Sequence, residues 1–163
     1  PYYMDQIDDI KKTIAEQQLD IVPVEGQEFD EEQQTALDDA IAQITDEDIY
    51  NYILEMNPDV KGIFATNGDT TMQALTACEG KDMKDVVIMG YDADQEEIDA
   101  MKDGRIAGMI VQNPYGMGYA TVVAEARCAL NMGNEANVNT GYTWVTPDNI
   151  EDRTVQDILY AEK

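Results

Sequence analysis

One pattern recurs three times along the middle of the chain and limits the fold more than any other feature. A short apolar run ends in polar residues and a helical pattern begins at once, first where "VKGIFA" leads into Asn67 and again after "DVVIMG" and "IAGMIVQ". Strands and helices that alternate with short connections are typical of parallel βαβ units. Strands that are apolar along their whole length indicate a sheet covered by helices on both faces. The sequence therefore predicts an α/β fold with an open, mostly parallel sheet and helices on both faces.

The segment before this pattern is predicted to be mainly helical. Isoleucines recur at helical spacing from Ile7 to Ile14, and "LDIVPVEG", residues 19–26, predicts a short strand. Apolar residues between 30 and 56 are spaced for two helices or for one long kinked helix. Thr45 is the candidate N-cap between the two, because three acidic residues follow it.

Charge and composition exclude several classes of function. The chain has 34 acidic and 10 basic residues, no histidine and a formal charge of -24. Such a charge opposes binding to nucleic acid or to an anionic membrane. The missing histidine removes the commonest general base and excludes Ser-His-Asp chemistry. No apolar run approaches the ~20 residues that a membrane-spanning helix needs.

Neither the cysteines nor the acidic clusters predict a metal or a cofactor. Cys78 and Cys128 are fifty residues apart in helix-like segments of small apolar residues, and we expect two buried free thiols. The loop from Asp92 to Asp103 spaces its acids like a calcium loop, but Glu97 replaces the glycine required at the sixth position. An acid-rich helix start explains this loop better.

Polar residues end all three apolar strands and form the candidate binding site. Asn67, Asp92 and Gln112 should stand at one edge of the sheet, where ligands of open α/β folds bind. Two amides and a carboxylate offer donors and acceptors suited to a neutral, polyhydroxylated ligand. Each residue also has a simpler interpretation, because Asn67 or Asp69 could cap the following helix and Asp92 could be a turn residue.

Three segments, taken together, resemble a known family. "NPDVKGIFATNGD", "VVIMGYDADQEEIDAMKDGRIAGMIVQNPYGMGYA" and "TGYTWVTPDNI" resemble the type I periplasmic binding proteins of sugar ABC transporters, the ribose- and galactose-binding group. Those proteins have two α/β lobes that close on a sugar. The resemblance implies that residues 1–112 form the second, C-terminal lobe, while 113–163 supply a crossover helix, a hinge strand and a C-terminal helix. The first lobe would then be absent from this chain.

The resemblance also assigns ligand-binding residues. The cleft-facing residues of ribose-binding relatives fall on Asn67, Asp92 and Gln112. The aromatic residue before the long helix falls on Phe29, whose ring could cover an apolar sugar face, with core packing as the alternative. Gln6 stands where relatives carry an arginine. Because glutamine lacks the planar five-donor guanidinium, the class of ligand is better supported than ribose itself.

The family resemblance implies a receptor and not an enzyme. We expect an extracytoplasmic solute-binding protein, periplasmic or a cell-surface lipoprotein, that delivers a sugar or a sugar-like ligand to an ABC transporter permease by hinge closure. It would need no cofactor and bind no nucleic acid. The alternatives are the effector-binding domain of a LacI-type transcriptional regulator and a carbohydrate-active enzyme, which would need two carboxyls about 5 to 9.5 Å apart.

The predicted helix from Pro114 to about Asn131 carries an apolar stripe with Tyr119, Val122 and Leu130 among its members. By resemblance this helix packs in the missing lobe. We therefore expect it to fold back on its own lobe, or to pair with another copy of the chain.

Overall fold

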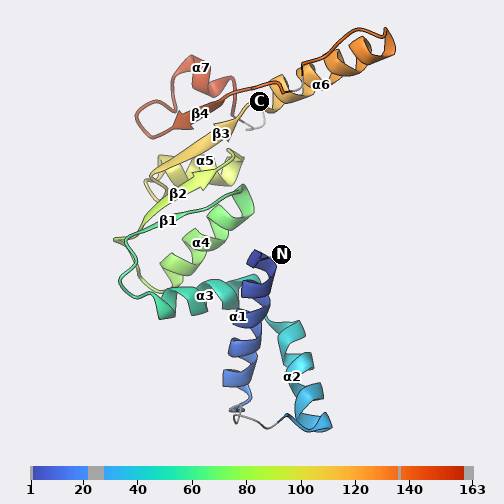
Figure 1. Cartoon of the computed structure of the whole chain (residues 1–163). Helices are drawn as coiled ribbons and strands as arrows, with labels where there is room; N and C mark the ends of the chain where they lie inside the picture. Colours follow the sequence, from blue (N-terminus) through green and yellow to red (C-terminus); the bar gives the residue numbers. More distant parts are fainter. Residues whose placement is uncertain (1, 22–27, 136, 160–163) are drawn as a thin grey trace. The chain divides into compact units, whose positions relative to one another are not determined.

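The chain forms two compact units in the computed structural model, which describes residues 2–21, 28–135 and 137–159 (Figure 1). The first unit consists of Pro1–Val60 with Thr76–Met83, and the second of Lys61–Leu75 with Lys84–Lys163. One division between the units falls inside helix α4 (Gly68–Gly80), which therefore contributes residues to both units.

The first unit is built on three helices, α1 (Tyr2–Gln18), α2 (Glu31–Gln43) and α3 (Asp46–Met56). The segment 30–56 thus forms two helices, as one of the two sequence interpretations predicted. Thr45 separates them because its side chain accepts a hydrogen bond from the Asp48 backbone at 3.2 Å, and the Asp48 carboxylate accepts from Thr45 N at 2.8 Å. This reciprocal capping box confirms Thr45 as the N-cap.

Apolar residues from all three helices meet in the core of the first unit. Ile14, Ile44 and Ile49 are buried together, and Ile10 and Tyr52 pack against them. Burial of these apolar residues stabilises the helices more than contacts on the polar faces do, because helical segments of this length are only marginally stable on their own.

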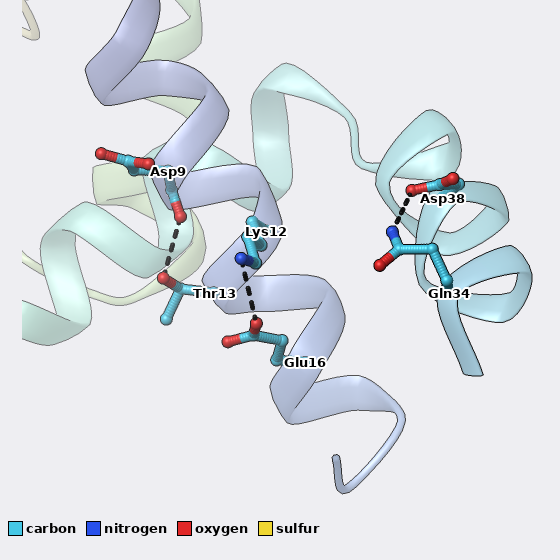
Figure 2. A network of polar contacts seen from close by, with 6 residues as sticks. All are labelled: Asp9, Lys12, Thr13, Glu16, Gln34 and Asp38. Atoms are coloured by element: carbon cyan, nitrogen blue, oxygen red, sulfur yellow. Dashed lines mark hydrogen bonds and ion pairs between the residues drawn. The ribbon is translucent and has the colours of Figure 1, made fainter. Parts of the chain in front are cut away.

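Polar contacts on α1 and α2 join residues four positions apart (Figure 2). The pairs are Thr13 with the Asp9 carbonyl at 2.8 Å, Lys12 with Glu16 at 3.8 Å, and Gln34 with Asp38 at 2.8 Å. Side-chain pairs at this spacing contribute only about 0.2 to 0.5 kcal/mol each. They therefore support the helices locally without deciding how the helices pack.

The strand predicted at 19–26 is not confirmed. Residues 22–27 lie outside the described residues, and Leu19 and Asp20 form a turn. Asp20 has φ 54, the left-handed conformation that ends many helices.

The second unit contains a four-stranded sheet of β1 (Gly62–Phe64), β2 (Val87–Tyr91), β3 (Gly108–Gln112) and β4 (Tyr142–Val145). The strands lie side by side in chain order. The first two neighbouring pairs are parallel, and β3 pairs with β4 antiparallel. The prediction of an open, mostly parallel sheet is confirmed.

Helix α5 (Gln95–Lys102) follows β2, and the short helix α7 (Arg153–Gln156) follows β4. The core of this unit joins the sheet to these helices. Its apolar side chains that are at most 5% exposed include Ile88, Met109, Val111 and Val145 from the sheet, Ile98 and Met101 from α5, and Val155 from α7.

Helix α6 (Pro114–Ala129) extends away from the sheet after β3 (Figure 1). None of its residues, all of which the structure describes, is buried. Tyr119, Val122 and Leu130 are 65 to 70% exposed, so the apolar stripe does not fold back on its own unit. Among the described residues, no helix has both the length and the apolar character needed to cross a membrane.

The two cysteines differ in exposure. Cys78 is buried, as predicted, and its desolvation raises the pKa of the thiol. The prediction for Cys128 is wrong, because this thiol is exposed on α6. The small apolar residues around Cys128 indicated a buried helix, but none of the residues of α6 is buried. The Asn134 amide instead approaches the Cys128 sulfur at 2.9 Å.

Candidate ligand site at the ends of the strands

The three polar residues selected from the sequence lie at the ends of neighbouring strands. Asn67 stands directly before α4, Asp92 directly follows β2, and Gln112 is the last residue of β3. Because β1, β2 and β3 are parallel neighbours, their carboxyl ends share one edge of the sheet. The topology therefore places these residues where the sequence predicted.

Asn67 and Asp92 come together at one surface hollow, of about 280 Å³, lined also by Gly68, Asp69 and Asp94. The Gly68 backbone N–H donates to Oδ2 of Asp92 at 3.4 Å, which ties the two loops to each other. Gln112 is half-buried at the end of the next strand and does not line this hollow. The structure thus joins two of the three predicted residues in one concave site.

Asn67 serves the fold as well as the site. Its Oδ1 accepts a hydrogen bond from Thr70 N at 2.9 Å, so it caps the start of α4 as the simpler interpretation proposed. The Asn67 side chain is nevertheless exposed at the hollow. Its oxygen is engaged by the helix, which leaves the amide NH₂ as the group a ligand can engage.

Asp92 has an unusual backbone conformation. Its φ of 81 lies in the left-handed region, which costs a residue other than glycine about 1 to 2 kcal/mol. Its backbone N–H donates to the Ile110 carbonyl at 3.0 Å, which extends the pairing with β3 by one residue. Strain of this kind concentrates at functional sites, where it fixes the direction of a side chain. Here it fixes the half-buried Asp92 carboxylate beside the hollow.

A fourth acidic residue lies behind this hollow. Asp94 caps α5 by accepting from Glu97 N at 3.0 Å, while Glu97 Oε2 accepts from Asp94 N at 3.3 Å. The Glu97 side chain is fully buried, and its desolvation raises its pKa from the ordinary 4.5 to about 7. Sequence reasoning missed Glu97 as part of the site. The spacing of Asp94 and Glu97 signals a capping box, but nothing in that spacing signals burial.

The two residues assigned by resemblance alone belong to the first unit. Gln6 is exposed on α1, and Phe29 is half-buried directly before α2. Their contribution to ligand binding stays a prediction.

The sequence of the chain matches a family of known proteins. The sequence profile described as "Periplasmic binding protein domain" matches residues 1–129, which is more than three quarters of the chain. The chain therefore belongs to that family, and its α/β architecture is that of the type I periplasmic sugar-binding proteins.

Particular relatives have named functions of their own. The ribose import binding protein of Salmonella typhimurium is 35% identical over 66 residues, which are 40% of this chain and 22% of that protein. The ribose import binding protein of Bacillus subtilis is 24% identical over 105 residues, which are 64% of this chain and 30% of that protein. The chain thus matches less than a third of the length of either relative.

Solved structures show the same likeness over a larger part of the chain. A carbohydrate transporter solute-binding protein from Agrobacterium radiobacter, in complex with D-arabinose, superposes with a TM-score of 0.64 at 26% identity. That alignment covers 79% of this chain and 50% of the other. A protein from Brachyspira murdochii, described as an ABC transporter and LacI family transcriptional regulator, has a TM-score of 0.60 at 25% identity, covering 71% of this chain and 40% of that one.

Proposed function

We propose that this chain is the second lobe of an extracytoplasmic receptor that binds a sugar or a sugar-like ligand and delivers it to an ABC transporter permease. The family assignment supports sugar binding, and the names of the ribose- and arabinose-binding relatives support the sugar class. On this proposal the protein is not an enzyme. It acts in the periplasm or as a lipoprotein at the cell surface.

The observation that carries this proposal is the meeting of Asn67 and Asp92 at one hollow. The Asp92 carboxylate accepts hydrogen bonds from hydroxyl groups, and the Asn67 amide donates to hydroxyl oxygens. No lysine or arginine is among the described residues that line the hollow, whose three ionisable side chains are all acidic. An anionic ligand would be repelled, whereas a neutral polyhydroxylated ligand satisfies both groups.

All the residues that line the hollow belong to one unit of this chain, and the other lobe would supply the opposite wall of the cleft. Gln112, at the end of the next strand, would add a contact as the lobes close, because only the closed state makes both sets of hydrogen bonds. A hydrogen bond to a sugar that is still half in water contributes little net free energy. This chain alone should therefore bind its ligand far more weakly than the two-lobe protein.

Thermal unfolding of the two-lobe protein with a panel of pentoses, hexoses, disaccharides and purine nucleosides tests the proposal. A ligand at 100 times its dissociation constant stabilises the folded state by about 2.7 kcal/mol, a shift of several degrees. One sugar should produce this shift in the unchanged protein. If no sugar does so, the ligand lies outside that class.

Two variants then locate the site. Asn67→Ser keeps an oxygen that can cap α4 but removes the amide, and Asp92→Ala removes the carboxylate. Both should abolish the sugar-induced shift. Glu96→Ala is the matched control, because Glu96 is an exposed acid in the same region that does not line the hollow. A full shift in Asp92→Ala, equal to that in the control, would place the ligand elsewhere.

A LacI-type effector domain remains the second candidate, because the Brachyspira murdochii protein carries that description. Such a domain shares the fold and differs in its output, which is a change of DNA affinity. The charge of -24 opposes an approach to DNA phosphates. Binding of the full-length protein to DNA, altered by the same sugar, would favour this candidate over the transporter receptor.

A further inference from the structure

The buried carboxyl of Glu97 lies directly behind the hollow that Asn67 and Asp92 share. Glu97 is 0% exposed, although acidic side chains are rarely buried without a cationic partner. Its Oε2 accepts from Asp94 N at 3.3 Å, and Oε1 has no hydrogen-bond partner within the described part of the chain. An unpartnered buried carboxylate oxygen is costly, so this position favours the protonated form of the acid.

Two glycines provide the space for this carboxyl. A Cβ on Gly68 would stand 3.2 Å from Glu97 Oε2, and a Cβ on Gly90 would stand 3.3 Å from Glu97 Oε1. Gly68 directly follows Asn67, and Gly90 lies two residues before Asp92. The carboxyl thus rests against the backbone of both segments that carry the candidate ligand-binding residues.

Thr71 connects the same carboxyl to the Asn67 loop. Thr71 is 0% exposed, its hydroxyl donates to the Asn67 carbonyl at 2.7 Å, and its side chain lies with Glu97 Oε1 against Gly90. Tyr91 N approaches the Thr71 oxygen at 3.4 Å from the end of β2. The loop before α4 and the end of β2 are therefore held by one buried polar cluster of Glu97 and Thr71.

The ionisable side chains that line the hollow in front of this cluster, within the described residues, are all acidic. Asp92 and Asp94 approach from the loop after β2, Asp69 lines the hollow from the first turn of α4, and Glu96 precedes Glu97 on α5. Burial is the main cause that raises the pKa of Glu97 to about 7, and the negative charges of Asp94 and Asp92 also raise this pKa. Hydrogen bonding to the Asp94 backbone and the Thr71 side chain lowers it. The carboxyl therefore changes its charge near neutral pH.

We propose that Glu97 in its uncharged form is a positioning residue of the ligand site, which holds the Asn67 and Asp92 loops together and makes sugar binding weaken as the pH rises. An ionised Glu97 would be repelled by Asp92 and Asp94 and would require water at its unpartnered oxygen, which separates the loops. A sugar in the hollow excludes water and favours the uncharged form further. Binding then takes up a proton, so affinity falls with rising pH by up to about tenfold per pH unit. This inference rests on the proposed function.

The first test needs no ligand. In the full chain labelled with ¹³C-glutamate, NMR should show one carboxyl that titrates near pH 7 and that is missing in Glu97→Gln. The amide signals of Gly68 and Asp92 should move with the same midpoint in the unchanged chain and stay fixed over that range in Glu97→Gln. Glu96→Gln is the control and should leave the titration unchanged. The inference would be overturned if the Glu97 carboxyl titrated near pH 4.5, or if the Gly68 and Asp92 amide signals did not move with the Glu97 titration.

The second test measures sugar binding to the two-lobe protein between pH 5.5 and 8.5 at constant ionic strength, with D-ribose and D-arabinose as probes. The dissociation constant should rise by roughly tenfold or more across this range, whereas Glu97→Gln should keep the tight low-pH value throughout. A bound sugar with the same pH profile in both proteins would refute the positioning role. If neither probe nor any other sugar binds, the proposed function fails, and the NMR titration still decides whether Glu97 positions the loops.

Discussion

Replacing Glu97 with glutamine should make the protein more stable at neutral and alkaline pH and leave it nearly unchanged in acid. Glutamine has the shape of the protonated acid but cannot ionise. The folded-state pKa of Glu97 is about 7 and the ordinary value is 4.5. Below pH 4.5 the carboxyl is protonated in both folded and unfolded chains, so its ionisation costs nothing. Between pH 4.5 and 7 the unfolded chain ionises first, and the folded state loses stability as the pH rises.

The size of this loss follows from the two pKa values. At about 1.4 kcal/mol per unit of pKa difference, the free energy of unfolding should fall by about 3 kcal/mol as the pH rises from 4.5 to 7, and then stay level. Urea unfolding of both proteins at intervals from pH 4 to 8.5, in ~0.15 M salt, measures the difference directly, and the other acids cancel in it. The advantage of Glu97→Gln should grow over this window. An advantage that is constant with pH, or that shrinks as the pH rises, would refute the burial of an uncharged Glu97.

Three further changes test the packing and the caps, each by urea unfolding. Gly90→Ala places a Cβ 2.7 Å from Thr71 Cγ2, so overpacking should cost about 1 to 3 kcal/mol. The control Gly118→Ala lies in a helix where the new Cβ meets nothing within 4 Å, and it should stabilise the protein by about 0.5 to 1 kcal/mol. Equal effects of the two variants would contradict the close approach at Gly90. Thr45→Ala removes the α3 capping box and should cost about 1 kcal/mol, with Thr45→Ser recovering most of it. Leu37→Ala empties a site that is 1% exposed and should cost about 2 to 5 kcal/mol, and a loss below 1 kcal/mol would show that Leu37 is not in a packed core.

Periodicity and local chemistry predicted most elements because those elements depend on nearby residues. The strand predicted from "DVVIMG" is observed at Val87–Tyr91, and the helical pattern predicted to follow it is observed as α5 at Gln95–Lys102. The N-cap Thr45 could likewise be predicted from the sequence, because its partner Asp48 is only three positions away. The parallel order of β1, β2 and β3 then placed the strand ends at one edge of the sheet.

The features that could not be predicted depend on contacts distant in sequence. Glu97 is an acidic residue in a polar segment, so its local sequence indicates an exposed side chain. It is buried because Gly68 and Gly90 leave room for it, and neither glycine is its neighbour in sequence. Cys128 shows the reverse case, because an apolar helical stripe indicates burial but cannot show whether another surface covers it.

The central claim is that a sugar binds at the hollow shared by Asn67 and Asp92, and NMR mapping of the chain tests it most directly. Two-dimensional ¹H–¹⁵N spectra recorded while D-ribose or D-arabinose is added up to about 100 mM detect even the weak binding expected of one lobe. The account predicts that the shifted amides concentrate at Asn67–Asp69 and Asp92–Asp94 and that Asp92→Ala removes these shifts. Shifts confined to other surfaces, such as the exposed face of α6, or spectra unchanged by every sugar of the panel, would contradict it.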